Sequence, residues 1–188
     1  SRLVFLGWMH AGTRNLITKN PVIKPEDLHG MKIRVQASPI ALDTLKAMGA
    51  NSIVMGVSEV FSGMQTGVID GTENNPPTFV AHNYLPVVKN YTWSKHFIIP
   101  ELFLFSKTKW DKLKKEDQDL IIKLAKEAQV EQRKLWEAYN AKSLETMKAN
   151  GVQFHDIDTD VFYKATQSVR DKYGKDHQDV IKRIQDVK

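Results

Sequence analysis

The sequence predicts an α/β fold with a parallel sheet at its core, crossed by one long helix. Short apolar runs alternate with helix-like segments through residues 25–70. Short connections between such elements give right-handed crossovers, which align the strands in parallel. Farther along, the stretch at about 115–149 contains neither Pro nor Gly. A helix over that stretch would be about 50 Å long.

The individual elements follow from local signals along the chain. Pro25 predicts a short helical turn that Gly30 stops, because Pro suits the first helical position. Ser58 is the expected N-cap of a helix that Gly67 closes. In chain order we expect strands or extended segments at 3–8, 31–35, 52–55, 68–70, 97–106 and 152–157, and helices at 40–48, 58–65, 115–149, 159–173 and 177–187.

The long helix constrains the architecture. A compact domain of 188 residues has a radius of gyration of only about 16 Å. A helix of about 50 Å must therefore protrude, form a coiled coil or bridge two lobes. Its apolar positions keep no strict heptad, so the sequence favours a bridging helix over a coiled coil.

Composition excludes several classes of protein. Hydrophobic residues make up 41% and charged residues 26%, as in a globular protein. The net charge of +5 is spread along the chain with both signs mixed, which favours solvated helix faces over a nucleic-acid patch. The absence of Cys excludes disulfide scaffolds, thiolate metal sites and a cysteine nucleophile. The chain opens without an initiator Met or a signal-like segment, so we expect either processing or a fragment.

Arg34 is the most informative single residue. It lies in the predicted strand at 31–35, on the face opposite the apolar side chains. Parallel strands are usually covered on both faces, so this guanidinium needs a carboxylate or carbonyl partner. Its planar fork suits a bidentate carboxylate of a ligand. The alternative is a structural salt bridge, for which the candidate partners are Asp43, Glu59 and Glu73.

Other candidate residues lie where ligands bind in such folds, beyond the carboxyl ends of strands. Asn74 follows the predicted strand at 68–70, and its amide could bond a ligand or simply stabilise a turn. Arg14 could clamp an anion or lie on the surface. Val57 could line a pocket wall, although core packing is the default for such a residue. His96, beside Phe97, is expected to be a hydrogen-bonded structural residue.

Signatures of catalysis are missing from the sequence. No Walker loop, GxGxxG or GxSxG motif occurs, and the six His residues show no HExxH pattern. Three alternating Asp residues at 156, 158 and 160 lack the Gly and Glu of a calcium loop. We therefore expect no catalytic residues, no metal and no cofactor.

Two segments resemble a known family. PEDLHGMKIRV at 25–35 and SEVFSGMQTGVIDGTEN at 58–74 are similar to two long motifs of TRAP-transporter solute-binding proteins of the dicarboxylate (DctP-like) type, at the expected separation. The resemblance covers about residues 8–155. It implies a periplasmic-binding-protein-like fold, with two α/β lobes hinged around a cleft and crossed by a long helix.

The resemblance also implies roles and boundaries. Arg34 would pair with the substrate carboxylate, Asn74 would hydrogen-bond the ligand, and Arg14 would lie near the same anionic end. Val57 stands where sialic-acid-type relatives often have an aromatic residue, which implies a different pocket wall. Full-length relatives carry about one more lobe before this segment, so residues 12–99 with 140–188 would form the ligand-binding lobe, and 1–11 with 100–139 would be remnants of the second.

The function implied is capture of an organic acid, a dicarboxylate or a sugar acid, in the periplasm and its delivery to the membrane permease subunits of a TRAP transporter. We expect a monomer that binds no nucleic acid. Two rivals remain at this point. One is an enzyme that processes carboxylates with Arg34 as the anchor, and the other is a basic α/β domain that binds nucleic acid.

Overall fold

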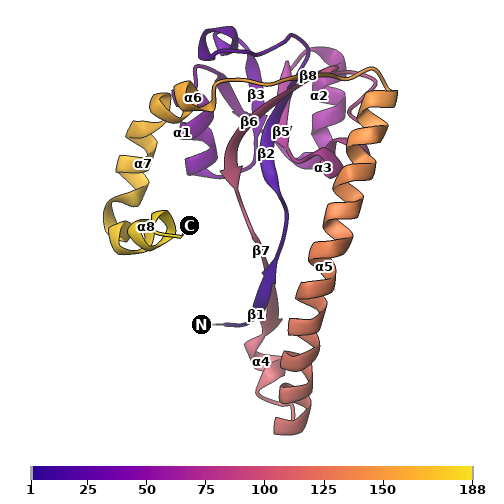
Figure 1. Ribbon diagram of the computed structural model, residues 1–188, viewed down its shortest axis with the longest axis vertical. Helices are drawn as coiled ribbons and strands as arrows, with labels where there is room; N and C mark the ends of the chain where they lie inside the picture. Colours follow the sequence, from indigo (N-terminus) through magenta and orange to yellow (C-terminus); the bar gives the residue numbers. More distant parts are fainter. Residues whose placement is uncertain (1, 188) are drawn as a thin grey trace.

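The computed structural model describes residues 2–187 and contains two sheets. The larger sheet has six strands in the order β4-β3-β5-β2-β6-β8, and the smaller sheet pairs β1 with β7 (Figure 1). The strands are β1 (Leu3–Met9), β2 (Thr13–Thr18), β3 (Lys32–Val35), β4 (Asn51–Val54), β5 (Gly71–Asn74), β6 (Asn90–Ile98), β7 (Glu101–Ser106) and β8 (Gln153–His155).

The helices confirm the α/β class. They are α1 (Pro39–Ala47), α2 (Val60–Thr66), α3 (Pro76–Ala81), α4 (Lys107–Trp110), α5 (Lys115–Ala149), α6 (Thr159–Ala165), α7 (Gln167–Gly174) and α8 (Gln178–Gln185). The expected long helix is confirmed as α5, with 35 residues. Among residues 2–187, none of the helices has an apolar stretch of the length that a bilayer requires.

The large sheet is mixed, whereas the sequence predicted a parallel one. β3 pairs in parallel with β4 and β5, as expected from the crossovers. β2 then inserts between β5 and β6 and runs antiparallel to both. Gly71 makes this insertion possible, because a Cβ there would lie 2.5 Å from the Ile17 carbonyl oxygen. The sequence did not predict a strand at 13–18, so the pairing of β2 with β5 and β6 was unexpected.

Each face of the large sheet carries its own core. One face packs against α2, α3 and α5 through a cluster that includes Ile17, Met64, Phe79, Tyr91 and Met147. The opposite face packs against α1 and α6 through a cluster that includes Leu16, Ile33, Val35, Leu45 and Phe162. Adjacent residues of β2 therefore point to opposite cores, as the strand period of two requires.

The long helix joins the two sheets (Figure 1). Its C-terminal half packs on α3 beside the large sheet, and its N-terminal half packs on β1. Gln132 of α5 accepts a hydrogen bond from the His10 backbone N–H (2.8 Å) and donates one to the His10 carbonyl (2.8 Å). Gln129 likewise accepts from the Trp8 backbone N–H (2.9 Å). These hydrogen bonds hold α5 against the end of β1, from which the chain continues into β2 of the large sheet.

Three expected boundaries were wrong. The third strand is β5 at Gly71–Asn74 rather than 68–70, because pairing with β2 begins only at Gly71, while Ile69 enters the core. β6 begins at Asn90 rather than at 97. Ser58 is not the N-cap expected for the second helix, since the Glu59 carboxylate accepts from the Gly56 backbone N–H (3.0 Å) instead.

Candidate functional site

The carboxyl ends of β3 and β5 lie side by side at the edge of the large sheet. The strand register places Ile33 opposite Gly71 and Arg34 opposite Thr72. The Thr72 hydroxyl donates to the Arg34 carbonyl at 3.4 Å. The two strands that carry the predicted site residues therefore end together, as they do at ligand sites of other open α/β sheets.

The Arg34 guanidinium is buried and only partly paired. Arg34 is 6% exposed, and its Nε donates to the Met55 carbonyl at 2.9 Å. Within residues 2–187, no hydrogen bond or ion pair engages its Nη1 and Nη2 atoms. Burial lowers the pKa of Arg34 below its ordinary value, while nearby Tyr84 and Glu73 oppose that shift. The Nη1 and Nη2 atoms of Arg34 are thus available to donate hydrogen bonds to another acceptor.

None of the three proposed structural partners bonds Arg34. The Asp43 carboxylate accepts from Lys172 (2.7 Å) and Tyr173 (2.8 Å). Glu59 caps the turn before α2, as described above. Glu73 pairs with a different arginine. The alternative prediction, a structural salt bridge from Arg34 to Asp43, Glu59 or Glu73, is therefore wrong.

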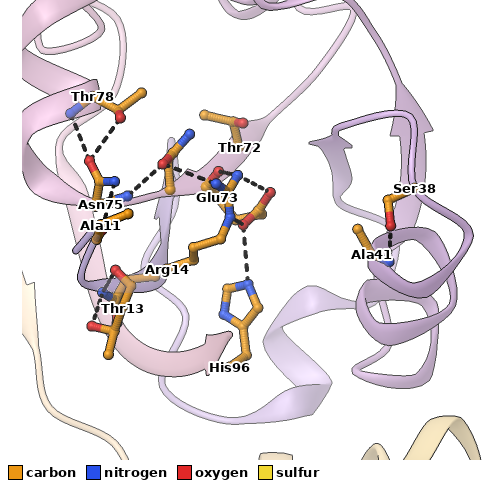
Figure 2. A network of polar contacts seen from close by, with 12 residues as sticks. Ala11, Thr13, Arg14, Ser38, Ala41, Thr72, Glu73, Asn75, Thr78 and His96 are labelled. Carbon is orange, nitrogen blue, oxygen red and sulfur yellow. Dashed lines mark hydrogen bonds and ion pairs between the residues drawn. The ribbon is translucent and has the colours of Figure 1, made fainter. Parts of the chain in front are cut away.

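Arg14 and Glu73 form a fork-to-fork ion pair (Figure 2). The Arg14 Nε donates to one carboxylate oxygen (2.6 Å), and Nη2 donates to the other (2.8 Å) and to the Glu73 carbonyl (3.1 Å). The Arg14 side chain is 12% exposed and that of Glu73 is fully buried. The guanidinium that the sequence assigned to the anionic end of a ligand is thus largely occupied by an internal carboxylate.

His96 lies on the other side of this carboxylate. Its Nε2 is 3.4 Å from Glu73 Oε2 (Figure 2). Its Nδ1 is 2.8 Å from the Ser94 hydroxyl. Burial of Glu73 favours its neutral form, but the hydrogen bonds from Arg14 and the contact with His96 outweigh burial. The pKa of Glu73 is consequently held below its usual 4.5.

The adjacent residues Asn74 and Asn75 have different surroundings. The Asn74 Oδ1 accepts from Arg14 Nη1 (3.2 Å) and from the Asn75 backbone N–H (2.9 Å). Its Nδ2 makes no hydrogen bond within the part of the chain that the structure describes. Asn75 is instead the N-cap of α3, accepting from the Thr78 backbone N–H (3.0 Å) and donating to the Ala11 carbonyl (3.1 Å) (Figure 2). Of these two amides, that of Asn74 is the one whose Nδ2 has no partner among residues 2–187.

Val57 begins the short turn that leads into α2. It is 45% exposed and stands two residues after Met55, whose carbonyl holds Arg34. This position leaves an aliphatic side chain in solvent next to the segment that anchors the guanidinium. Core packing, the default expectation for this residue, is wrong.

The sequence did not reveal that Glu73 and His96 meet beside Arg14. Glu73 was considered as a partner for Arg34, and the prediction that His96 is a hydrogen-bonded structural residue is confirmed by its contact with Ser94. The signal that could have linked them is strand pairing. Leu16 lies opposite Glu73 on β2, and Arg14 pairs with Phe97, the neighbour of His96, on β6.

A hollow lies beside this network. A cavity of about 470 Å³ opens between β6, α1, α6 and α7, and His96, Phe97, Thr44, Phe162 and Arg170 are among its lining residues. Across residues 2–187, no cluster of three or more His, Asp or Glu residues could hold a metal ion.

Comparisons with known proteins identify relatives along almost the whole chain. The model of the family "bacterial extracellular solute-binding protein, family 7" (DctP) matches residues 2–176. A TRAP periplasmic solute-binding protein from Citrobacter koseri, solved with bound D-glucuronate, is 72% identical with a TM-score of 0.95, covering 100% of this chain and 62% of that one. A second, from Pseudomonas putida F1 and also with bound D-glucuronate, is 52% identical with a TM-score of 0.97, covering 100% and 61%.

A curated relative gives the same assignment. A solute-binding protein from Chromohalobacter salexigens is 32% identical over 187 residues, which is 98% of this chain and 56% of that protein. The chain thus spans little more than half the length of this relative. The chain belongs to family 7 of the bacterial extracellular solute-binding proteins, the DctP family, whose members bind solutes rather than catalyse reactions.

Proposed function

We propose that this chain is the ligand-binding part of an extracytoplasmic solute-binding subunit of a TRAP transporter, and that it captures a sugar acid through Arg34. The observation that carries the proposal is the buried guanidinium whose Nη1 and Nη2 atoms have no partner within residues 2–187. A desolvated cation without an anion is costly, and a ligand carboxylate would offset that cost with two charge-assisted hydrogen bonds.

The nature of the acid follows from the relatives. Two solved members with 72% and 52% identity contain D-glucuronate. Uronates combine one carboxylate with several hydroxyls, which suits a site that offers a guanidinium beside amide groups. Within the proposal, Asn74 donates through Nδ2 to the ligand, and Val57 forms part of the pocket wall.

Arg14 takes a supporting part in this proposal. Its fork is bound to Glu73, while its Nη1 holds the Asn74 Oδ1. The Asn74 amide therefore has its Nδ2 directed by Arg14. Arg14 lies near the anionic end of the ligand in this proposal, but Glu73 balances its charge, so its part is to fix the orientation of Asn74.

The larger setting is proposed as well. Residues 12–99 with 140–188 form the ligand-binding lobe, and 1–11 with 100–139 belong to a second lobe. A hinge between the lobes would close on the ligand, exclude water and strengthen the ion pair. The loaded protein, a monomer in the periplasm, would deliver the acid to the membrane permease subunits. Neither a nucleic acid nor a cofactor takes part.

The test is calorimetry on protein expressed from its full reading frame. Wild type should bind D-glucuronate, and Arg34→Lys should weaken binding at least about ten-fold, because an ammonium cannot reproduce the planar fork. Arg133→Lys, at an exposed position of α5, is the matched control and should bind like wild type. An unchanged Kd in Arg34→Lys, or turnover of the acid by wild type, would contradict the proposal.

A further inference from the structure

One polar side chain next to Arg34 is unused by everything described so far. Gln36 follows the last residue of β3 and is half-buried. No hydrogen bond engages its side-chain amide anywhere in residues 2–187, although its carbonyl accepts from the Ser38 backbone N–H at 2.7 Å. A half-buried side-chain amide whose N–H donors and carbonyl acceptor are unused can form hydrogen bonds with a ligand.

The strand register brings this amide near Arg34 and Asn74. Arg34 stands opposite Thr72 on the parallel neighbour β5, and these are the last residues paired between the two strands. Gln36 follows two residues after Arg34, directly beyond β3, and Asn74 ends β5 two residues after Thr72. Residues two apart share a face where the extended backbone continues. Arg34, Gln36 and Asn74, here called the polar row, lie at the carboxyl ends of two adjacent strands.

The neighbours of this row are already engaged. Lys32, the preceding residue on the same face of β3, donates through Nζ to the Gly67 carbonyl at 2.6 Å. Ser38, which begins α1, uses its hydroxyl to accept from the Ala41 backbone N–H at 3.4 Å. Unlike Lys32 and Ser38, Gln36 keeps all the hydrogen-bonding groups of its side chain available within residues 2–187.

We propose that Gln36 hydrogen-bonds a ring hydroxyl of the sugar acid whose carboxylate pairs with Arg34, and so favours hydroxylated acids over acids without hydroxyls. This inference rests on the proposed function. Residues two apart on a strand are separated by roughly 6.6 Å, a distance on the scale of one sugar ring. An amide can both donate to and accept from a hydroxyl, which a second cationic group could not do. A site built around such a bond rejects ligands that lack the hydroxyl, because its amide is then left unpaired.

Calorimetry with D-glucuronate tests the inference, using protein expressed from its full reading frame. Gln36→Met keeps the length of the side chain but removes the amide, and it should weaken D-glucuronate binding about ten-fold. Cyclohexanecarboxylate keeps the ring and the carboxylate but has no hydroxyls. The thermal shift that it gives at millimolar concentration should be at least as large in Gln36→Met as in wild type, because the variant has no amide to leave unpaired.

Two further variants make the result decisive. Gln65→Met, at an exposed position of α2, is the matched control and should bind D-glucuronate like wild type. Gln36→Asn keeps a polar side chain if Gln36→Met folds poorly, and it should also lose affinity because its amide is withdrawn by one methylene.

The outcomes separate the inference from the function on which it rests. Unchanged D-glucuronate affinity in both Gln36 variants, with Arg34→Lys impaired, would overturn the role of Gln36 alone. A cyclohexanecarboxylate shift that falls in Gln36→Met would also overturn it, because the loss would then not depend on hydroxyls. Failure of wild type to bind any sugar acid would refute the proposed function itself.

Discussion

The ion pair between Arg14 and Glu73 should be a major support of the large sheet, and Glu73→Gln tests this directly. The variant keeps the shape of the side chain but removes its charge. Arg14 would then keep a guanidinium that is only 12% exposed opposite a neutral amide. Breaking a buried pair by neutralising one partner costs about 3–5 kcal/mol, since the remaining charge stays desolvated. We expect the free energy of unfolding to fall by that amount.

The measurement is urea denaturation followed by circular dichroism at pH 7, with the slope compared between proteins. Asp111→Asn is a control, because Lys107 and Asp111 form an exposed pair one helical turn apart on α4. Exposed pairs contribute about 0.2–1 kcal/mol, so this control should lie near wild type. A loss below about 1 kcal/mol in Glu73→Gln would show that the fork-to-fork pair does not stabilise the sheet as argued.

Two further predictions concern the same region. The pKa of Glu73 is lowered in the folded protein, so its stabilising effect should be complete above its ordinary value of 4.5 and should fade as the pH falls below it. Between pH 6 and pH 3, wild type should therefore lose more stability than Glu73→Gln in denaturation curves, and parallel losses would contradict this. Gly71→Ala should destabilise by about 1–3 kcal/mol, because its Cβ would lie 2.5 Å from the Ile17 carbonyl oxygen. A melting temperature equal to that of wild type would mean that β2 and β5 can move apart freely.

Much of the fold was readable because local signals agreed with one another. The long helix was predicted with its bounds, since a stretch without Pro or Gly and ending at Gly151 leaves few alternatives. The strand containing Arg34 and the helix after it were placed to within a residue or two. These elements are set by period and by end signals, which the sequence carries directly.

The antiparallel strand β2 was not readable. Residues 13–18 read Thr-Arg-Asn-Leu-Ile-Thr, in which the site residue Arg14 and the buried Asn15 break the apolar pattern of a central strand. β5 was misplaced for the same reason, because Gly71, Thr72 and Glu73 have the composition of a turn. Strands that carry polar site residues lose the hydrophobic signal by which strands are recognised.

The sequence by itself determined the α/β class and the long helix, and it singled out Arg34 as the candidate ligand-binding residue, because each inference depends on residue type and spacing within a short segment. Only the tertiary structure decided which arginine pairs with which carboxylate. Arg14 and Glu73 are 59 residues apart in the chain, and they meet because β2 inserts between β5 and β6. That pairing satisfies the buried carboxylate, and so it leaves the Arg34 guanidinium without an internal anion.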